Sequence, residues 1–218
     1  MKFGDVAAQQ AFERAVVNIE AASGAEVMVA IRARSAAYAH VHGAVAALCG
    51  FALLAFMLFS ENEFSLLWIL VLPLVAAAVG VLMCEAVPWI RRVGTSTSQR
   101  HRATQRAAQA TFVELGVHRT TARVGVLFYF SLLERSCTVI ADQAVAAAVA
   151  APELAALEAQ LAATMAAGGV ATANAMDRIL PLLKTLPRRA NDRNELPDRL
   201  NVKADSLPYR TRLFGGRV

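Results

Sequence analysis

Two uncharged, strongly apolar runs separated by only four residues constrain this chain more than any other feature of its sequence. The first extends from Gly43 to Phe59 and the second from Phe64 to Cys84. As a helix, the second run would be about 30 Å long, which is the thickness of the hydrocarbon core of a bilayer. The first would reach roughly 25 Å, and residues 36–42 can lengthen it without placing a full charge in lipid. Both runs are therefore predicted to be transmembrane helices.

The connecting residues and the flanking charges predict the orientation of this pair. Ser60-Glu61-Asn62-Glu63 suffice only for a turn, so the helices must form an antiparallel hairpin with both outer ends on one side. The turn carries no Lys or Arg, whereas arginines flank both outer ends, and residues 86–113 contain no Asp or Glu. Cytoplasmic flanks of membrane helices are enriched in Lys and Arg. We predict a multi-pass protein of the bacterial inner (cytoplasmic) membrane with the N-terminus and the C-terminus in the cytoplasm.

The composition agrees with this interpretation. Hydrophobic residues make up 56% of the 218 residues and charged residues only 18%, whereas an ordinary soluble domain has about 25% charged residues. The net charge of +5 comes almost entirely from arginine, and alanine is abundant, as expected of a GC-rich bacterial genome. High apolar content and only three cysteines exclude a disordered chain and a disulfide scaffold.

The segment that follows the second run is the candidate membrane-surface site. Trp68 and Trp89 lie where interfacial aromatic anchors are expected, and Glu85 is expected to reach the interface from one turn before Trp89. Arginines near a bilayer attract anionic headgroups, each by around 1 kcal/mol. The candidate residues are Arg91, Arg92, Arg100, Arg102 and Arg106. A nucleic-acid site or a phospholipid-specific site is the less favoured alternative, because no aromatic side chains for base stacking are interleaved with these arginines. No nucleic-acid partner is predicted.

Outside the apolar runs, hydrophobic periodicity predicts a mixture of helices and strands. A helix and a strand precede the hairpin; a helix, two strands and two further helices follow it. Their predicted ranges are 6–22 and 26–32, then 99–115, 123–131 and 136–141, with the last two helices beginning near Pro152 and Val170. Residues 187–218 show neither period and are assigned to a polar, flexible tail.

The strand over 123–131 is apolar on both faces, which is typical of a central strand covered by helices on both sides. Neither the part before the hairpin nor the part after it can cover this strand alone. An antiparallel hairpin returns the chain to within about 10 Å of where it left, so its insertion costs little. We therefore predict one α/β domain with a small central sheet flanked by helices. It is built from residues 1–40 and 99–186, interrupted by a transmembrane hairpin at 41–90 and followed by the tail at 187–218.

Several short sequence motifs follow one another along residues 6–200. They are Gly24-Ala25-Glu26-Val27 before the hairpin, then residues 112–120, 125–135 and 139–142 after it, and finally Leu186-Pro187 and residues 194–198. In this order they resemble the TPM-domain family, and more narrowly its bacterial membrane-embedded subgroup, in which a hairpin splits the domain after a Gly-x-Glu-Val strand.

The resemblance implies an α/β sandwich with a small central sheet. Relatives in soluble compartments of plants and bacteria have been linked to acid phosphatase activity, to divalent-cation binding and to the maintenance of membrane complexes. This sequence departs from them at Ala122-Arg123-Val124, where they carry Asn-Asp or Asp-Arg, and at Gln143-Ala144, where Lys-Gly or Arg-Gly is common. A carboxylate-based metal or phosphate site would lose ligands at both places. The predicted cytoplasmic side also differs from the lumenal or periplasmic placement of the phosphatase-like relatives.

Asp142, at the end of a strand, and Glu134, in a turn, are the best-placed acids for chemistry. They could converge on the carboxyl edge of the sheet, where open α/β folds bind ligands, and together hold Mg²⁺ or Ca²⁺. Two acids make a weak site, and turn chemistry favours the simpler interpretation of Asp142 as a cap and Glu134 as a hairpin residue. No catalytic residue, metal ligand or cofactor is therefore assigned firmly.

The remaining motifs narrow the function to two hypotheses. The chain has no phosphate loop, no dinucleotide fingerprint and no nucleophile elbow, and Cys137 lies in a predicted strand with no histidine nearby. The preferred hypothesis is a membrane-anchored interaction or scaffold module whose cytoplasmic domain binds the anionic membrane surface or other membrane proteins. The alternative is a divalent-metal-dependent phosphatase that uses Asp142 and Glu134. The sequence leaves the substrate, the partner and the oligomeric state open.

Overall fold

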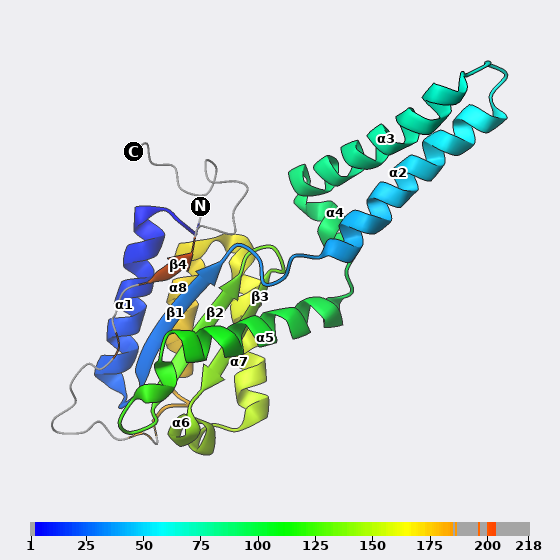
Figure 1. Cartoon of the computed structure of the whole chain (residues 1–218). Coiled ribbons are helices and arrows are strands. Elements are labelled where there is room, and N and C mark those ends of the chain that lie inside the picture. The colour runs from blue at the N-terminus through cyan, green and yellow to red at the C-terminus, as the bar shows by residue number, and fades with distance from the viewer. Residues whose placement is uncertain (1–2, 185, 187–195, 197–199, 204–218) are drawn as a thin grey trace. The chain divides into compact units, whose positions relative to one another are not determined.

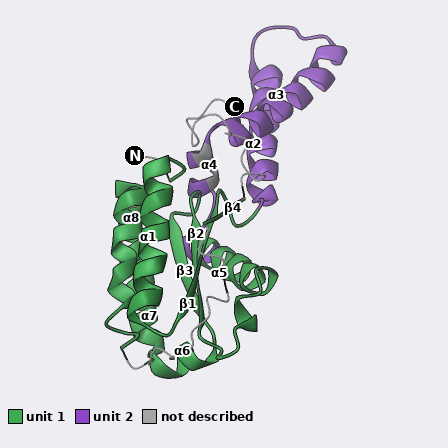
Figure 2. Cartoon of the chain, turned by 90° about the vertical axis from the view of Figure 1, so that its left-hand side faces the viewer, with its two compact units in different colours: residues 1–36, 100–218 green, residues 37–99 purple. Residues whose placement is uncertain are grey.

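The computed structural model describes residues 3–184, 186, 196 and 200–203, apart from the side chains of Pro88, Arg91 and Lys203. It contains two compact units, which Figure 2 colours separately. Residues 1–36 and 100–218 form the α/β unit, and residues 37–99 form the hairpin unit.

The segment before the hairpin forms the helix and the strand predicted for it. Helix α1 (Val6–Ala22) buries Phe12, Val16 and Ile19, which lie on one stripe. It ends at Ser23, whose hydroxyl donates to the carbonyl oxygen of Ile19 at 2.7 Å. Strand β1 (Glu26–Arg32) follows after Gly24 and Ala25, and all seven of its residues are buried.

A four-stranded mixed sheet forms the centre of the α/β unit. Its other strands are β2 (Gly125–Ser131), β3 (Ser136–Ala141) and β4 (Asn201–Lys203), and the order across the sheet is β3-β2-β1-β4. Strand β1 pairs in parallel with both β2 and β4, whereas β2 and β3 form an antiparallel hairpin. The central place of β2 confirms the prediction drawn from its two apolar faces, since all seven of its residues are buried.

Strand β4 is a correction to the assignment of residues 187–218 as a tail without regular structure. Asn201–Lys203 pair with Ala30–Arg32 of β1 and thereby cover the outer edge of that strand. Leu196 is also buried, in the apolar cluster that contains Met28 and Tyr129. A strand of three residues is too short to create a detectable alternation of apolar and polar positions. The rest of the predicted tail lies outside the described residues.

Helices cover both faces of the sheet (Figure 1). Helices α1, α7 (Ala151–Thr164) and α8 (Gly169–Ala175) lie on one face, where they enclose the larger apolar cluster with Val27, Val29 and Phe128. Helix α5 (Thr97–Glu114) covers the other face through Ala108 and Phe112. The short elements are α6 (Gln143–Ala148) and the 3₁₀ turns η1 (Val117–Arg119), η2 (Met165–Ala167) and η3 (Met176–Ile179). The predicted α/β class with a small sheet between helices is therefore confirmed at this level.

The start of β2 requires a glycine because another backbone segment lies against it. A Cβ atom on Gly125 would lie 2.3 Å from the carbonyl oxygen of Val117 in η1. No side chain fits at that separation, so Gly125 allows η1 to pack against the end of the sheet.

The hairpin unit consists of α2 (Ala39–Phe59), α3 (Leu66–Ala86) and the short α4 (Pro88–Val93). Helices α2 and α3 are long and apolar enough to cross a membrane, with mean hydropathies of 2.1 and 2.7. They pack on each other through small residues: a Cβ on Gly80 would lie only 3.0 Å from the Cys49 sulfur. Their outward apolar side chains are exposed, for example Phe51 and Leu66 at 70% and 87%.

Candidate functional site

Four polar side chains, three of them buried and one partly exposed, form a cluster at the carboxyl edge of β1 and β2, where the chain leaves the α/β unit for the hairpin. We call Ser35, Tyr129, Ser131 and Glu134 the junction cluster. The backbone N–H of Ser35 donates to Glu134 Oε1 at 2.9 Å, and the Ser35 hydroxyl donates to Ser131 Oγ at 2.8 Å. Ser131 in turn donates to Glu134 Oε2, and the hydroxyls of Ser35 and Tyr129 lie 3.2 Å apart.

The carboxylate of Glu134 fixes the direction of every hydrogen bond in this cluster. An ionised carboxylate only accepts, so Ser131 must give its proton to Glu134 and Ser35 must give its proton to Ser131. The remaining proton, on Tyr129, must then be donated to Ser35 Oγ. The result is one directed chain from Tyr129 through the two serines to Glu134, in which each hydrogen bond polarises the next.

Burial makes this network costly to break. Glu134 is only 4% exposed, and Ser131 and Tyr129 are almost completely buried. Burial raises the pKa of Tyr129 above its ordinary value, and the positive charge of Arg32 lowers it in part. Arg32, at the end of β1, is 7% exposed, and burial lowers its pKa. Its Nη1 donates to the carbonyl oxygen of Asn201 in β4 at 2.9 Å.

The junction cluster holds the segment that leads into the hairpin. After β1, the carbonyl oxygens of Arg32 and Ala33 accept from the N–H groups of Leu132 and Leu133 in the β2–β3 turn, at 2.9 and 2.8 Å. Ser35 then binds Glu134 of the same turn. Both oxygens of Glu134 thus serve to position backbone and side chains, so Glu134 acts as a structural hairpin residue, the simpler of the two interpretations.

Asp142 also has a structural role, as the N-cap of α6. Its Oδ1 accepts from the N–H of Gln143 at 2.8 Å, and its Oδ2 lies 3.7 Å from Nη1 of Arg123. Arg123 has a left-handed backbone with φ 55° and donates to the carbonyl oxygen of His118 at 2.6 Å. Asp142 and Arg123 therefore hold α6 and η1 together beside Gly125. The interpretation of Asp142 as a cap is confirmed.

The expected convergence of Asp142 and Glu134 is wrong. Because β3 runs antiparallel to β2, its end lies at the edge where β2 begins, and Ala141 pairs with Val126. Glu134 follows the end of β2, so the length of a seven-residue strand, about 20 Å, separates the two acids. They cannot share a metal ion. Among the residues that the structure describes, no group of three His, Cys, Asp or Glu side chains is placed to hold one.

Cys137 is not placed as a nucleophile. It is 1% exposed within the larger apolar cluster, and burial raises its pKa well above that of a free thiol. Because the thiolate is the reactive form, both effects suppress its reactivity.

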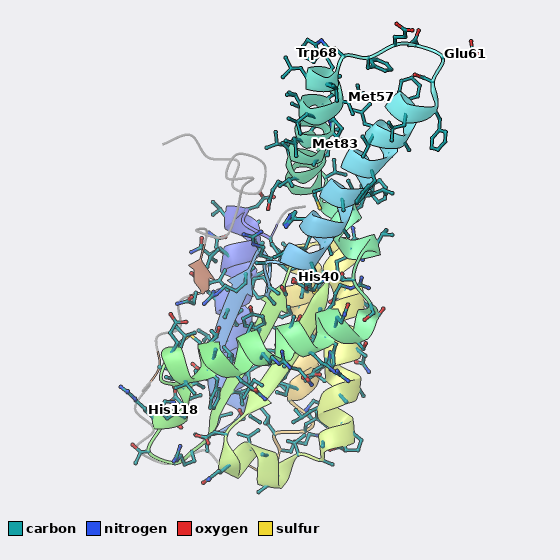
Figure 3. All side chains as sticks on the ribbon, turned by 45° about the vertical axis from the view of Figure 1, so that its right-hand side comes forward. His40, Met57, Glu61, Trp68, Met83 and His118 are labelled. Carbon is teal, nitrogen blue, oxygen red and sulfur yellow. The ribbon has the colours of Figure 1, made fainter. Side chains whose placement is uncertain are left out.

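The hairpin unit carries polar groups at both of its ends. Figure 3 shows Trp68 and Glu61 beside the connecting turn and His40 at the opposite end. Trp68 and Trp89 are 52% and 63% exposed. Near the end that carries His40, Nε2 of His42 in α2 lies 3.2 Å from Oε1 of Glu85 in α3. Glu85 is thus within ion-pair distance of the neighbouring helix.

The candidate arginines are distributed over two helices. Arg92 lies on α4, and the side chain of Arg91 is outside the described residues. Arg100, Arg102 and Arg106 lie on α5; the first is half-buried and the other two are exposed.

Sequence reasoning missed Ser35, Tyr129 and Ser131. A usable signal was present, because Tyr129 and Ser131 are the hydroxyl-bearing residues of an otherwise apolar strand and their spacing of two places them on one face. Nothing local in the sequence indicates that Ser35, some 95 residues earlier, completes the set.

Comparison with known proteins supports the fold but no function. No model of a known protein family and no curated protein matches the sequence. Among solved structures, the chain is similar to the NMR structure of BA42 protein from the psychrophilic bacterium Bizionia argentinensis, with a TM-score of 0.54. The match covers 93% of this chain and 97% of that one at 12% sequence identity. At this identity the likeness concerns the fold alone.

Proposed function

We propose that this chain is a membrane-anchored TPM-like protein whose α/β unit works at the cytoplasmic surface of the bacterial inner membrane as an interaction or scaffold module. One observation carries the proposal: two 21-residue apolar helices interrupt the α/β unit between Ala36 and Arg100. Only 11% and 6% of their most apolar windows is buried within the protein, so these helices are not the core of a soluble domain. Apolar side chains exposed to this extent need an apolar environment that shields them from water, and the hydrocarbon core of a bilayer provides one.

The distribution of charge supports the proposed orientation. The turn between α2 and α3 contains Glu61 and Glu63 and no cation, whereas Arg92, Arg100, Arg102 and Arg106 follow α3. By the positive-inside rule, this distribution of charge favours the proposed cytoplasmic side for the α/β unit and both termini. Anionic headgroups and other proteins of the same membrane are the proposed partners.

The geometry of the acids favours binding over catalysis. Glu134 is occupied by the junction cluster and Asp142 by α6, and they lie at opposite edges of the sheet. A phosphatase that uses both acids is therefore not proposed. An interaction module needs no such site.

Cysteine labelling in intact bacterial cells tests the anchoring and the orientation. A cysteine introduced as Asn62→Cys in the turn is expected to react with a membrane-impermeant maleimide added outside. A cysteine introduced as Asn18→Cys, on the exposed side of α1, is expected to react only after the inner membrane has been permeabilised.

The parent chain measures the background. It should be small because Cys84 and Cys137 are buried, and Cys49, which is partly exposed, lies within the apolar helix α2. Labelling of Asn18→Cys in intact cells would reverse the orientation. Recovery of the chain in the soluble fraction after alkaline extraction of membranes would refute the anchor itself.

A further inference from the structure

Helix α5 has two opposite faces of different character. Thr104, Ala108 and Thr111 are buried, and Ala108 packs on the sheet next to Met28 and Leu127. On the opposite face, side chains spaced by four, three and four residues form one line along the helix. We call these residues the outward stripe; they are Arg102, Arg106, Gln109 and Val113, and all four are exposed.

The charges on α5 are arranged against the preferences of the helix itself. Arg100, His101, Arg102 and Arg106 all lie in its first ten residues, at the end where the helix dipole is already positive. Its one acid, Glu114, is its last residue, at the negative end of the dipole. Arg102 and Arg106 are also four residues apart, a spacing at which like charges repel.

Nothing within the described part of the molecule offsets this arrangement for the outward stripe. Neither Arg102 nor Arg106 has a hydrogen bond or an ion pair there, and Val113 is 61% exposed. An unfavourable charge arrangement that no contact within the protein offsets is expected where a surface binds a partner.

We propose that the outward stripe of α5 lies against anionic phospholipid headgroups. This inference rests on the proposed function, since the bilayer is the one that holds the hairpin. Thr97, the first residue of α5, follows Ala86, the last of α3, by eleven residues, so the helix stays at high effective concentration near that surface. Each guanidinium can bind a phosphate through two parallel hydrogen bonds, Gln109 adds an amide donor, and Val113 contacts the acyl boundary.

The test uses the full chain in nanodiscs of neutral phosphatidylcholine or of phosphatidylcholine mixed with phosphatidylglycerol. An environment-sensitive dye on Gln105→Cys, which is exposed beside the outward stripe, reports access to the neutral quencher acrylamide. We expect lower quenching in the anionic discs than in the neutral ones, with the difference reduced by salt. The double variant Arg102→Gln/Arg106→Gln should weaken docking about fivefold for each arginine removed.

The matched control is Arg14→Gln/Arg119→Gln, which removes the same charge from exposed arginines elsewhere in the α/β unit. It should keep the lipid dependence; an equal loss would show a general charge effect and overturn the inference. Equal quenching in both discs would also overturn it, while labelling of Asn62→Cys still tests the hairpin separately. Protection by duplex DNA in neutral discs would assign the stripe to nucleic acid instead. A chain that does not enter the discs would remove both proposals.

Discussion

At the scale of single residues, the polar atoms that matter here serve to hold chain segments together. The sequence was sufficient to identify Asp142 as a cap, because capping depends on a residue and its immediate neighbours. It was not sufficient to place Ser35 against Glu134, because that contact depends on parallel pairing of β1 with β2 across the inserted hairpin. Local chemistry is therefore predictable from the sequence at this scale, whereas contacts across the sheet are not.

The hydrogen-bond network from Tyr129 to Glu134 predicts that Tyr129→Phe lowers the free energy of unfolding by an amount that depends on pH. At neutral pH the variant should lose about 1 kcal/mol of unfolding free energy, because one buried hydrogen bond is missing. The raised pKa of Tyr129 means that the unfolded chain loses this proton first, so the parent becomes less stable as the pH rises above about 10. The difference between parent and variant should therefore shrink from pH 8 to pH 11 in urea unfolding followed by circular dichroism in detergent.

Ser35→Ala is the matched control for this experiment. It removes the same hydrogen bond, together with the one from Ser35 to Ser131, but retains the titrating phenol, so it should keep the decline of stability that the parent shows at high pH. A Tyr129→Phe curve parallel to the parent curve would contradict the proposed origin of the decline.

At the scale of elements, periodicity succeeded where an element is long. Residues 6–22 were predicted to the residue as α1 from the helical spacing of their apolar side chains, and residues 26–32 as β1 from a nearly continuous run of apolar, strand-forming residues. The turn predicted at residues 132–135 already requires β3 to run antiparallel to β2, because so short a connection cannot join parallel strands, and the convergence of Asp142 with Glu134 was expected without applying that constraint. Strand β4 was not predicted, because its three residues form a strand only through their pairing with β1 and show no strand pattern of their own.

Packing of η1 against β2 predicts a severe effect of Gly125→Ala. The added Cβ would lie 2.3 Å from a backbone oxygen of buried Val117, so either the strand or η1 must move. A loss of at least about 2 kcal/mol of unfolding free energy is expected, measured by the same urea unfolding.

Gly43→Ala provides the comparison, since its added Cβ meets nothing within 4 Å among the described residues. This variant should be at least as stable as the parent, because alanine is a better helix former than glycine. Wild-type stability of Gly125→Ala would contradict the packing of η1 described above.

At the scale of the whole molecule, a single folded unit is built from two separate stretches of sequence. The two-sided apolar character of β2 was enough to predict a central strand between helix layers. It did not predict that residues 201–203 form one edge of the sheet, because their pairing with β1 joins segments that lie far apart in the sequence. The transmembrane length of the inserted helices was visible directly, since composition alone determines it.

A chain without the hairpin should therefore fold and remain soluble. We expect this when residues 37–99 are replaced by a Gly/Ser linker of about 20 residues, which spans about 25 Å on average. Hydrogen exchange should find the β1 amides as protected as those of β2, because the two strands are paired throughout. Rapid exchange in β1 alone would mean that the first stretch does not dock without the hairpin.

The interruption between β1 and β2 also determines the order of events during synthesis. The ribosome completes β1 some 90 residues before its partner β2 emerges, which at about 5–20 residues per second is a delay of roughly 5–20 s. During that interval the nascent strand is apolar and lacks its partner β2. Under the proposed function, α2 and α3 would enter the membrane before the α/β unit can fold, and delayed insertion would leave β1 open to aggregation or proteolysis.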